Sequence, residues 1–470
     1  MLPEDSKITL RYYFHYILVG LLISVIISVP VLLDWPVLYP VIIVGAISFI
    51  YLIRYRFELQ ILDFGYLIVL FALLAPPLNL SSSLPLIRPD EILIYIFCPL
   101  ILLNGFKKNT HDPRAIIYIK IYSAFLLVFI VSSIYGVLFL DVPYGKRDFF
   151  EFVTTAKYLM VFFVFSAITI DQHQIKKILH YVLFLILLSG IFGLLQYYSL
   201  FGLDTLTAPL YLQDRLHIFD DRITGTFKNP NTFSSVLLLG HIIALTRFLF
   251  SKNLAEKYYT FFATLILVVL LLFAGSRTVL FIYFLITLSL LVLGVFTSGV
   301  SKKQLSLLIG FITIGFLLSI SFLSYEIILR FQSGIDILND DSLSLRFFVW
   351  FFNFQIFLES PIIGWGPAKA LHPVVVDNEY LLILRRYGII GLISFLGIYL
   401  YPLKISFSRF WKKKRTPYYF DIIIASIIVS FGIANITNGL FLSAQVMDFW
   451  IVLLGLYFAH LKSMQDVKLS

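Results

Sequence analysis

Charged residues are scarce in this chain: they make up 13% of its 470 residues, whereas 60% are hydrophobic and the mean hydropathy is +0.93. A soluble domain carries about a quarter charged residues, so the composition excludes an ordinary soluble protein. Apolar segments long enough to cross a hydrocarbon core of about 30 Å recur from residue 16 to residue 461. No stretch of soluble-domain composition interrupts them. We therefore predict one all-α polytopic membrane domain over residues 1–470.

Cysteine is almost absent as well, because Cys98 is the single one, and this excludes a disulfide framework. Cys98 lies in an apolar segment and is expected to be a small buried residue. The first apolar run, 16–33, has no small-residue cleavage site, which favours a retained first helix over a removed signal peptide. Basic segments interleaved with aromatic residues are also missing, so the net charge of +9 does not indicate nucleic-acid binding.

Apolar runs separated by charged breaks predict fourteen transmembrane helices. They cover residues 16–33, 37–53, 61–76, 91–106, 115–140, 151–170, 177–201, 231–250, 258–275, 278–297, 304–325, 388–405, 418–441 and 445–461. With the N-terminus in the cytoplasm, 23 of the 36 Lys and Arg residues lie inside and 12 outside, while Lys157 falls within a span. Every cytoplasmic connection then carries at least two basic residues, as the positive-inside rule requires. Both termini are therefore predicted to be cytoplasmic.

Nine of the twelve outer cations cluster in three elements: an outer loop at 202–230, a tight turn, and a long loop at 326–387. These cations are Arg215, Arg222 and Lys228 in the first, Arg277 in the second, and Arg330, Arg346, Lys369, Arg385 and Arg386 in the third. Cations on this side oppose the topology signal, and loops of such length are uncommon unless they are functional. An anionic ligand at the outer face explains both features. The alternative is ordinary solvated loops with some lipid headgroup contacts.

Residues 343–358 of the long loop are aromatic-rich but contain Arg346, Asn353 and Gln355. This mixture is typical of a helix that lies in the membrane interface, and we expect such a helix between the eleventh and twelfth spans. A fifteenth span would invert the basic loop 409–415, so we reject it.

The first outer element ends with the run from Arg222 to Asn231. Gly225 and the Asn-Pro-Asn sequence predict a turn, after which Pro230 and Asn231 suit a helix start. The free N–H groups and the dipole of a helix start favour an anion, and Arg222 and Lys228 would flank it. A helix cap with solvated charges is the alternative interpretation.

The second element is the Arg277 turn. An arginine between two apolar spans is costly unless it is paired or faces water, and its guanidinium suits bidentate phosphate binding. Snorkelling of the side chain to the interface is the alternative interpretation.

The third element contains the Gly/Pro cluster 361–367, then Asp377 and Asn378, then Gly388 and Gly391. The cluster predicts an irregular turn. Asp377 either caps a helix or, beside a sugar hydroxyl, acts as a general base. The two later glycines permit close helix packing at the start of the next span.

These three elements, in this order, resemble the O-antigen polymerase and O-antigen ligase superfamily of bacterial envelope glycosyltransferases. The resemblance covers about residues 215–400, and its distinctive parts are the loop beginning at Arg346–Trp350 and the ending Asp377-Asn378-x9-Gly388-x-x-Gly391. In the ligase branch a histidine stands in the place of Asp377. The sequence is therefore more similar to the polymerase branch, called Wzy-type.

The resemblance implies a glycosyl transfer that uses neither a metal nor a cofactor, at the periplasmic face of the bacterial inner membrane. The donor would be an oligosaccharide on undecaprenyl diphosphate, and the acceptor another lipid-linked repeat unit; the product would be O-antigen, capsule or exopolysaccharide. Arg222 and Arg277 would stabilise the diphosphate and Asp377 would activate the acceptor hydroxyl. The substrate-binding residues implied are Arg215, Lys228, Asn231, Arg346, Asn378 and Tyr380. Membrane lipids, a chain-length regulator and a flippase are the expected partners, and nucleic acid is not.

Three rival functions stay open. An O-antigen ligase would share the donor but transfer it to lipid A core, with His372 or His217 supplying the imidazole. A lipid-linked oligosaccharide flippase also fits fourteen spans, but we find no internal repeat and expect few ionisable residues within the spans. A metal-dependent glycosyltransferase would need an acidic pair such as Asp90–Glu91 or Asp220–Asp221, each of which a helix start or a solvated turn also explains.

Overall fold

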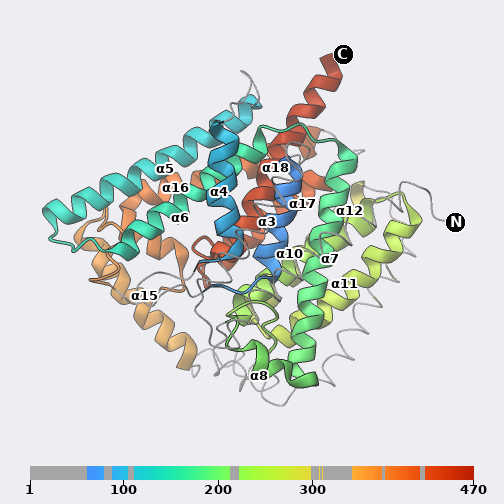
Figure 1. Ribbon diagram of the computed structural model, residues 1–470, viewed down its shortest axis with the longest axis horizontal. Helices are drawn as coiled ribbons and strands as arrows, with labels where there is room; N and C mark the ends of the chain where they lie inside the picture. Colours follow the sequence, from blue (N-terminus) through green and yellow to red (C-terminus); the bar gives the residue numbers. More distant parts are fainter. Residues whose placement is uncertain are drawn as a thin grey trace.

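Helices dominate the computed structural model, and no β-sheet occurs in the part of the chain that it describes (Figure 1). The described residues are 61–78, 87–103, 111–211, 222–297, 306, 310, 341–372, 376–412 and 419–469. The helices are α3 (Ile61–Leu74), α4 (Pro89–Leu103), α5 (Pro113–Phe139), α6 (Lys146–Ser166), α7 (Gln172–Tyr197), η1 (Leu200–Gly202), α8 (Leu203–Thr207), α10 (Pro230–Phe250), α11 (Leu254–Ala274), α12 (Arg277–Thr297), α15 (Asp341–Glu359), α16 (Glu379–Lys412), α17 (Tyr419–Ala434) and α18 (Ala444–Leu469). The all-α prediction is confirmed for these residues.

Eight of the described helices are long and apolar enough to cross a membrane: α5, α6, α7, α10, α11, α12, α16 and α18. The apolar helices α3 and α17 are shorter. The predicted spans 16–33 and 37–53, and nearly all of 304–325, lie outside the described residues. The structure is thus that of a polytopic membrane protein, whereas the total of fourteen spans and the sidedness of the termini stay predictions.

The centre of the bundle consists of α10 and α18, which are buried along most of their length. Helix α18 packs on α3 and α6, and α10 packs on α7, α11, α12 and α17. Figure 1 shows α5 and α6 extending together to one side of this centre, with α7, α11 and α12 on the other side. Helix α15 lies across the lower part of the view, on the side of α5 and α6, and packs against α16.

The helix ends follow local sequence signals. Asp171 caps α7 by accepting a hydrogen bond from the Gln174 N–H, and the Gln174 side-chain oxygen accepts one from the Asp171 N–H. Asn229 caps α10, whose first residue is Pro230, as the sequence predicted. Gly275 closes α11 in the left-handed conformation that glycine adopts at little cost.

One end of the bundle collects the segments that carry the candidate site. The Thr437 hydroxyl lies 3.0 Å from that of Thr278 at the start of α12, and the Gln445 side chain donates to the Thr226 carbonyl at 3.1 Å. The Glu379 N–H, where α16 begins, donates to the Asn435 carbonyl at 2.8 Å. The predicted topology puts this end on the periplasmic side of the membrane, and we call it the outer end.

Several helix boundaries differ from the predicted spans, and two of them shape the outer end. Helix α17 ends at Ala434 rather than near 441, and residues 435–443 form an irregular segment before α18. The Asn435 side-chain carbonyl accepts a hydrogen bond from the Leu440 N–H, which replaces a helical bond with a local one. Helix α16 begins at Glu379 rather than at 388, and it bends at Gly388.

A buried ion cluster crosses the bundle interior. The Lys157 ammonium lies 2.8 Å from a Glu91 carboxylate oxygen and 2.7 Å from one of Asp448, and all three side chains are almost inaccessible. Arg247–Glu256 is a further ion pair between α10 and α11, and Arg409–Asp421 is one between α16 and α17. The few ionisable residues of the predicted spans that form these pairs are thus neutralised within the chain. Assigning Lys and Arg residues to one side of the membrane does not show which charged residues pair with one another.

Replacement of Lys157 by methionine is expected to destabilise the protein strongly, because it leaves the Glu91 and Asp448 carboxylates buried without a cation. Breaking a buried ion pair from one side costs about 3–5 kcal/mol. Thermal unfolding of the detergent-solubilised protein measures the effect. Lys120→Met is the matched control, since Lys120 is exposed on α5. Equal unfolding temperatures for the two variants would contradict the assignment.

Candidate functional site

The first two predicted elements are in direct contact at the outer end. The buried Arg222 side chain donates from Nε to the Ala274 carbonyl at 2.9 Å and from a terminal nitrogen to the Asn231 side-chain oxygen at 2.8 Å. The Ile223 N–H donates to the Phe273 carbonyl at 3.2 Å. The segment that begins at Arg222 therefore runs alongside the end of α11 and meets the start of α10.

The turn between α11 and α12 is shaped to receive this arginine. Gly275 has a φ of +61°, and a Cβ there would lie 3.3 Å from Arg222 Nε. Arg277, two residues later, is the first residue of α12 and is partly exposed. Lys228 is exposed close to the start of α10. Two helix starts and three cations thus gather in one region, although Arg222 is already hydrogen-bonded there.

The turn 224–227 anchors this arrangement to the bundle. The Thr226 hydroxyl donates to the Leu73 carbonyl at the end of α3, and it lies 2.7 Å from the Ser189 hydroxyl of α7. The anchoring keeps the Arg222 backbone in place between two helices.

Asp377 and Asn378 have different surroundings, although they are adjacent. Asn378 lies at the start of α16 and accepts a hydrogen bond from the Leu381 N–H at 3.1 Å, so the capping side chain is Asn378. The Asp377 carboxylate is about half exposed (49%) and lies 3.3 Å from Arg346 Nε of α15. The Tyr380 hydroxyl donates to the Gly432 carbonyl at 2.5 Å. The side chains of Asn378 and Tyr380 are engaged in these hydrogen bonds, whereas the Asp377 carboxylate is accessible to a ligand.

Sequence reasoning missed the irregular segment 435–443, which lies among all three predicted elements. Its contacts reach Glu379 and Thr278, and Gln445, two residues after the segment, donates to the Thr226 carbonyl. The sequence Asn435-Ile-Thr-Asn-Gly439 carries the signal, because short polar residues and glycine interrupt helices. The apolar residues Leu440 and Phe441 follow directly. Hydropathy averaged over a span-length window therefore stays high across the break and does not reveal it.

Glu379 is a second residue that sequence reasoning missed. Its side chain is fully buried at the start of α16, and its carboxylate faces the backbone of Phe441 and Leu442. Buried carboxylates are costly and concentrate at functional sites. Glu379 therefore joins Asp377 as an acidic candidate at this end.

Three of the cations predicted for an anion already have partners. Glu151 of α6 accepts from Arg386 at 2.6 Å and from the Lys369 ammonium at 2.7 Å, and the Tyr387 hydroxyl donates to it at 3.1 Å. Arg385 donates to the Asn353 side-chain oxygen of α15. The outer cations of the long loop are therefore partly structural: they tie residues 361–372, α15 and α16 to α6.

The Gly/Pro turn 361–367 forms one unit with the bend in α16. The Trp365 N–H donates to the Arg385 carbonyl at 3.1 Å, and the Gly366 N–H donates to the Arg386 carbonyl at 2.7 Å. Gly388 has a φ of +63°, and a Cβ there would lie 2.1 Å from the Ile362 carbonyl oxygen. The predicted close packing at this glycine is thus an approach of two backbones.

His372, the imidazole considered for a ligase, packs against Trp365 with ring centroids 5.4 Å apart. Burial, together with the nearby Arg385, lowers the pKa of His372 to about 4. An efficient general base has a pKa near the working pH, so the environment of His372 does not favour that role.

Several candidates lie outside the described residues: Arg215, His217, Asp220–Asp221 and Arg330. Asp90 pairs with Arg88 at 3.2 Å, whereas Glu91 pairs with Lys157. This acidic pair therefore neutralises cations inside the bundle. Across the described ranges, His, Cys, Asp and Glu form no group of three that could hold a metal ion.

No protein-family model matches this sequence, and no curated protein matches it either. The candidate site therefore rests on its own residues and geometry.

Gly388→Ala is expected to destabilise the unit of the turn and α16. Both the positive φ and the backbone approach oppose a Cβ, and strain of this kind costs about 1–3 kcal/mol. Gly310→Ala is the control, because a Cβ at Gly310 meets nothing within 4 Å. The fraction of monodisperse protein that survives a heat challenge in detergent measures the difference. A Gly388→Ala variant as stable as the wild type would show that the two segments do not pair in this way.

Proposed function

We propose that this protein is a Wzy-type membrane glycosyltransferase that polymerises undecaprenyl-diphosphate-linked oligosaccharide repeat units at the outer face of the bacterial inner membrane. The observation that carries the proposal is the contact of Arg222 with the turn directly before Arg277. Two arginines from separate outer elements meet beside two helix starts, an arrangement suited to a lipid diphosphate.

The arginines act on the leaving group. As the bond between the donor sugar C1 and the phosphate oxygen breaks, the electron pair stays on the diphosphate, and preorganised cations stabilise the growing charge. Arg222 is held by Ala274 and Asn231, so its guanidinium needs little rearrangement. Arg277, partly exposed at the start of α12, contacts the diphosphate from the water side. Lys228 and, in the same loop, Arg215 extend this positive region.

Asp377 acts on the acceptor. Its carboxylate accepts the proton of the acceptor hydroxyl while the hydroxyl oxygen forms the new bond to C1 of the donor sugar. The ion pair with Arg346 orients this carboxylate. The Asn378 amide nitrogen can donate to a sugar, because its side-chain oxygen serves the helix cap. Tyr380 holds the start of α16 against α17 through Gly432 and so positions Asp377.

A flippase for lipid-linked oligosaccharide is the second candidate function. The buried cluster of Lys157, Glu91 and Asp448 supports it, because ionisable groups inside a membrane often mark transport pathways. The polymerase is preferred because the accessible cations and Asp377 lie at one end of the bundle, where a transfer reaction takes place.

Arg277→Ala and Asp377→Ala are expected to reduce polymerisation by roughly a hundredfold or more, because removal of one transition-state contact has an effect of that size. Purified protein is incubated with lipid-linked repeat unit, and the polymer ladder is measured on a gel. Lys252→Ala, at an exposed lysine just after α10, is the control.

Long polymer from both variants at normal expression would show that the assigned roles are wrong. Wild-type protein that moves lipid-linked repeat unit across a reconstituted bilayer but never lengthens it would establish the flippase instead.

A further inference from the structure

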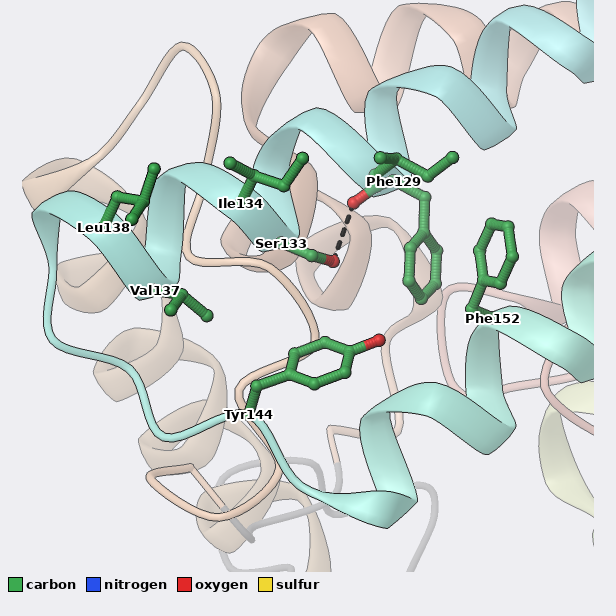
Figure 2. Close-up of a pocket in the computed structure, with 8 residues that line it drawn as sticks. Phe129, Ser133, Ile134, Val137, Leu138, Tyr144 and Phe152 are labelled. Carbon is green, nitrogen blue, oxygen red and sulfur yellow. Dashed lines mark hydrogen bonds between the residues drawn. The ribbon is translucent and has the colours of Figure 1, made fainter.

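An apolar groove lies between the outer halves of α5 and α6, with a volume of about 520 Å³. This is within the usual size range of ligand pockets. Figure 2 shows Ile134 and Val137 on α5, Phe129 and Phe152 at the inner end, and Tyr144 reaching back from the α5–α6 connection. The Tyr144 hydroxyl points toward Phe129 and Phe152 (Figure 2). The groove is thus lined almost entirely by apolar side chains, and the Tyr144 hydroxyl is directed at its inner end.

The walls of the groove are held in place from behind. A Cβ at Gly136 would lie 2.3 Å from the Trp365 carbonyl oxygen, so the turn 361–367 lies directly against this part of α5. The Ser132 hydroxyl donates to the Ile363 carbonyl at 2.6 Å. At the inner end, the Phe129 and Phe152 rings lie 5.4 Å apart. The hollow is therefore part of the packed structure, and it stays open between two supported helices.

Exposed cations lie beside the outer end of the groove. Lys146 and Arg147 form the first turn of α6, two and three residues after Tyr144, and both are exposed. In the described part of the chain neither has an ion pair. The buried Asp148 carboxylate forms no ion pair with either cation and accepts from the backbone N–H groups of Gly145 and Lys369. Asp141, in the same connection, is exposed and balances one of the two charges.

These two residues are the outer cations for which the candidate site gives no explanation. Arg88, the third cation outside the predicted clusters, donates to the carbonyls of Phe71, Ala72 and Ala75 and so closes α3. Lys146 and Arg147 have no such partner in the described residues and still lie on the side that the positive-inside rule disfavours. A bound anion would account for them.

The groove is also separate from the region of Arg222 and Arg277. Figure 1 shows α5 and α6 extending to one side of the molecule, with α11 and α12 on the other side. A polymerase takes two lipid-linked substrates at once, a donor and an acceptor, and each carries a diphosphate on a long isoprenoid chain. One diphosphate region serves only one of them.

We propose that the α5–α6 groove binds the isoprenoid chain of the acceptor substrate, and that Lys146 and Arg147 bind the diphosphate of that same molecule. This inference rests on the proposed function, in which Arg222 and Arg277 serve the donor. Tyr144 lines the groove, and its ring contacts the isoprenoid chain. The acceptor is thereby held while its sugars extend toward Asp377.

Two synthetic substrates separate the acceptor from the donor. An acceptor-only analogue has a phosphonate in place of the sugar–phosphate bond, so it cannot lose its diphosphate. A donor-only analogue has its acceptor hydroxyl methylated. Val137→Trp fills the groove, and Leu127→Trp, on an exposed part of α5 outside it, is the matched control.

The Val137→Trp variant is expected to raise the KM for the acceptor-only analogue at least about tenfold, with the donor KM unchanged, since loss of apolar contacts in a pocket has effects of that size. Lys146→Gln combined with Arg147→Gln is expected to do the same. An acceptor with a ten-carbon chain should bind wild type and Val137→Trp alike, an outcome that general destabilisation would not produce. Equal effects on donor and acceptor KM would overturn the proposal.

Photocrosslinking tests the site in the unmodified protein. An undecaprenyl diphosphate with a diazirine in its chain is expected to label peptides covering 129–152, and excess undecaprenyl diphosphate should prevent the labelling. Equal protection by phosphatidylglycerol would show an ordinary lipid site and overturn the proposal. Absence of polymer from wild-type protein that is labelled at 129–152 would contradict the proposed function, whereas normal polymer with labelling elsewhere would contradict only this inference.

Discussion

Inside a membrane, a charged or unpaired polar group must find its partner within the same chain, and this constraint shapes the bundle. Lys157 forms ion pairs with two carboxylates, from α4 and α18, and Arg88 donates hydrogen bonds to three carbonyls at the end of α3. Glu151 forms ion pairs with Lys369 and Arg386 and accepts a hydrogen bond from the Tyr387 hydroxyl. In each case residues far apart in the chain are joined, so the same contacts that remove the cost of burial also determine which helices are neighbours.

At the outer end, backbone N–H and carbonyl groups also find their hydrogen-bond partners within the chain. Three irregular segments lie there, 222–229, 361–372 and 435–443, and each gives its N–H or carbonyl groups to a neighbouring helix. Irregular backbone at membrane depth is tolerated where it is buried in protein or lines a water-filled space. These segments hold Arg222, Lys369 and Glu379 where a continuous helix could not. The chemistry proposed for this end therefore depends on breaks in the helices as much as on the helices.

The sequence predicted the helices well where the signal is local. The start of α10 at Pro230 follows from local turn and helix-start signals. The sequence grouped Arg222 and Arg277 only as outer cations, whereas the contact of Arg222 with the Ala274 carbonyl comes from the structure. The break at 435–443 escaped because hydropathy averages hide a few polar residues among apolar ones. Glu151 as the partner of Arg386 escaped for a different reason: 235 residues separate the pair, and no periodicity encodes a contact at that distance.

The partners of Lys157 become available at different times during synthesis. Glu91 precedes Lys157 by 66 residues, whereas Asp448 follows it by 291. A nascent chain that has reached α6 already holds a neutral Glu–Lys pair, which lowers the cost of inserting the lysine-bearing helix. Helix α18 follows much later in the chain and brings Asp448, a second carboxylate for the same ammonium. The ammonium thus serves as a docking point for the last described helix, and the order of the ion pairs along the chain sets an order of assembly.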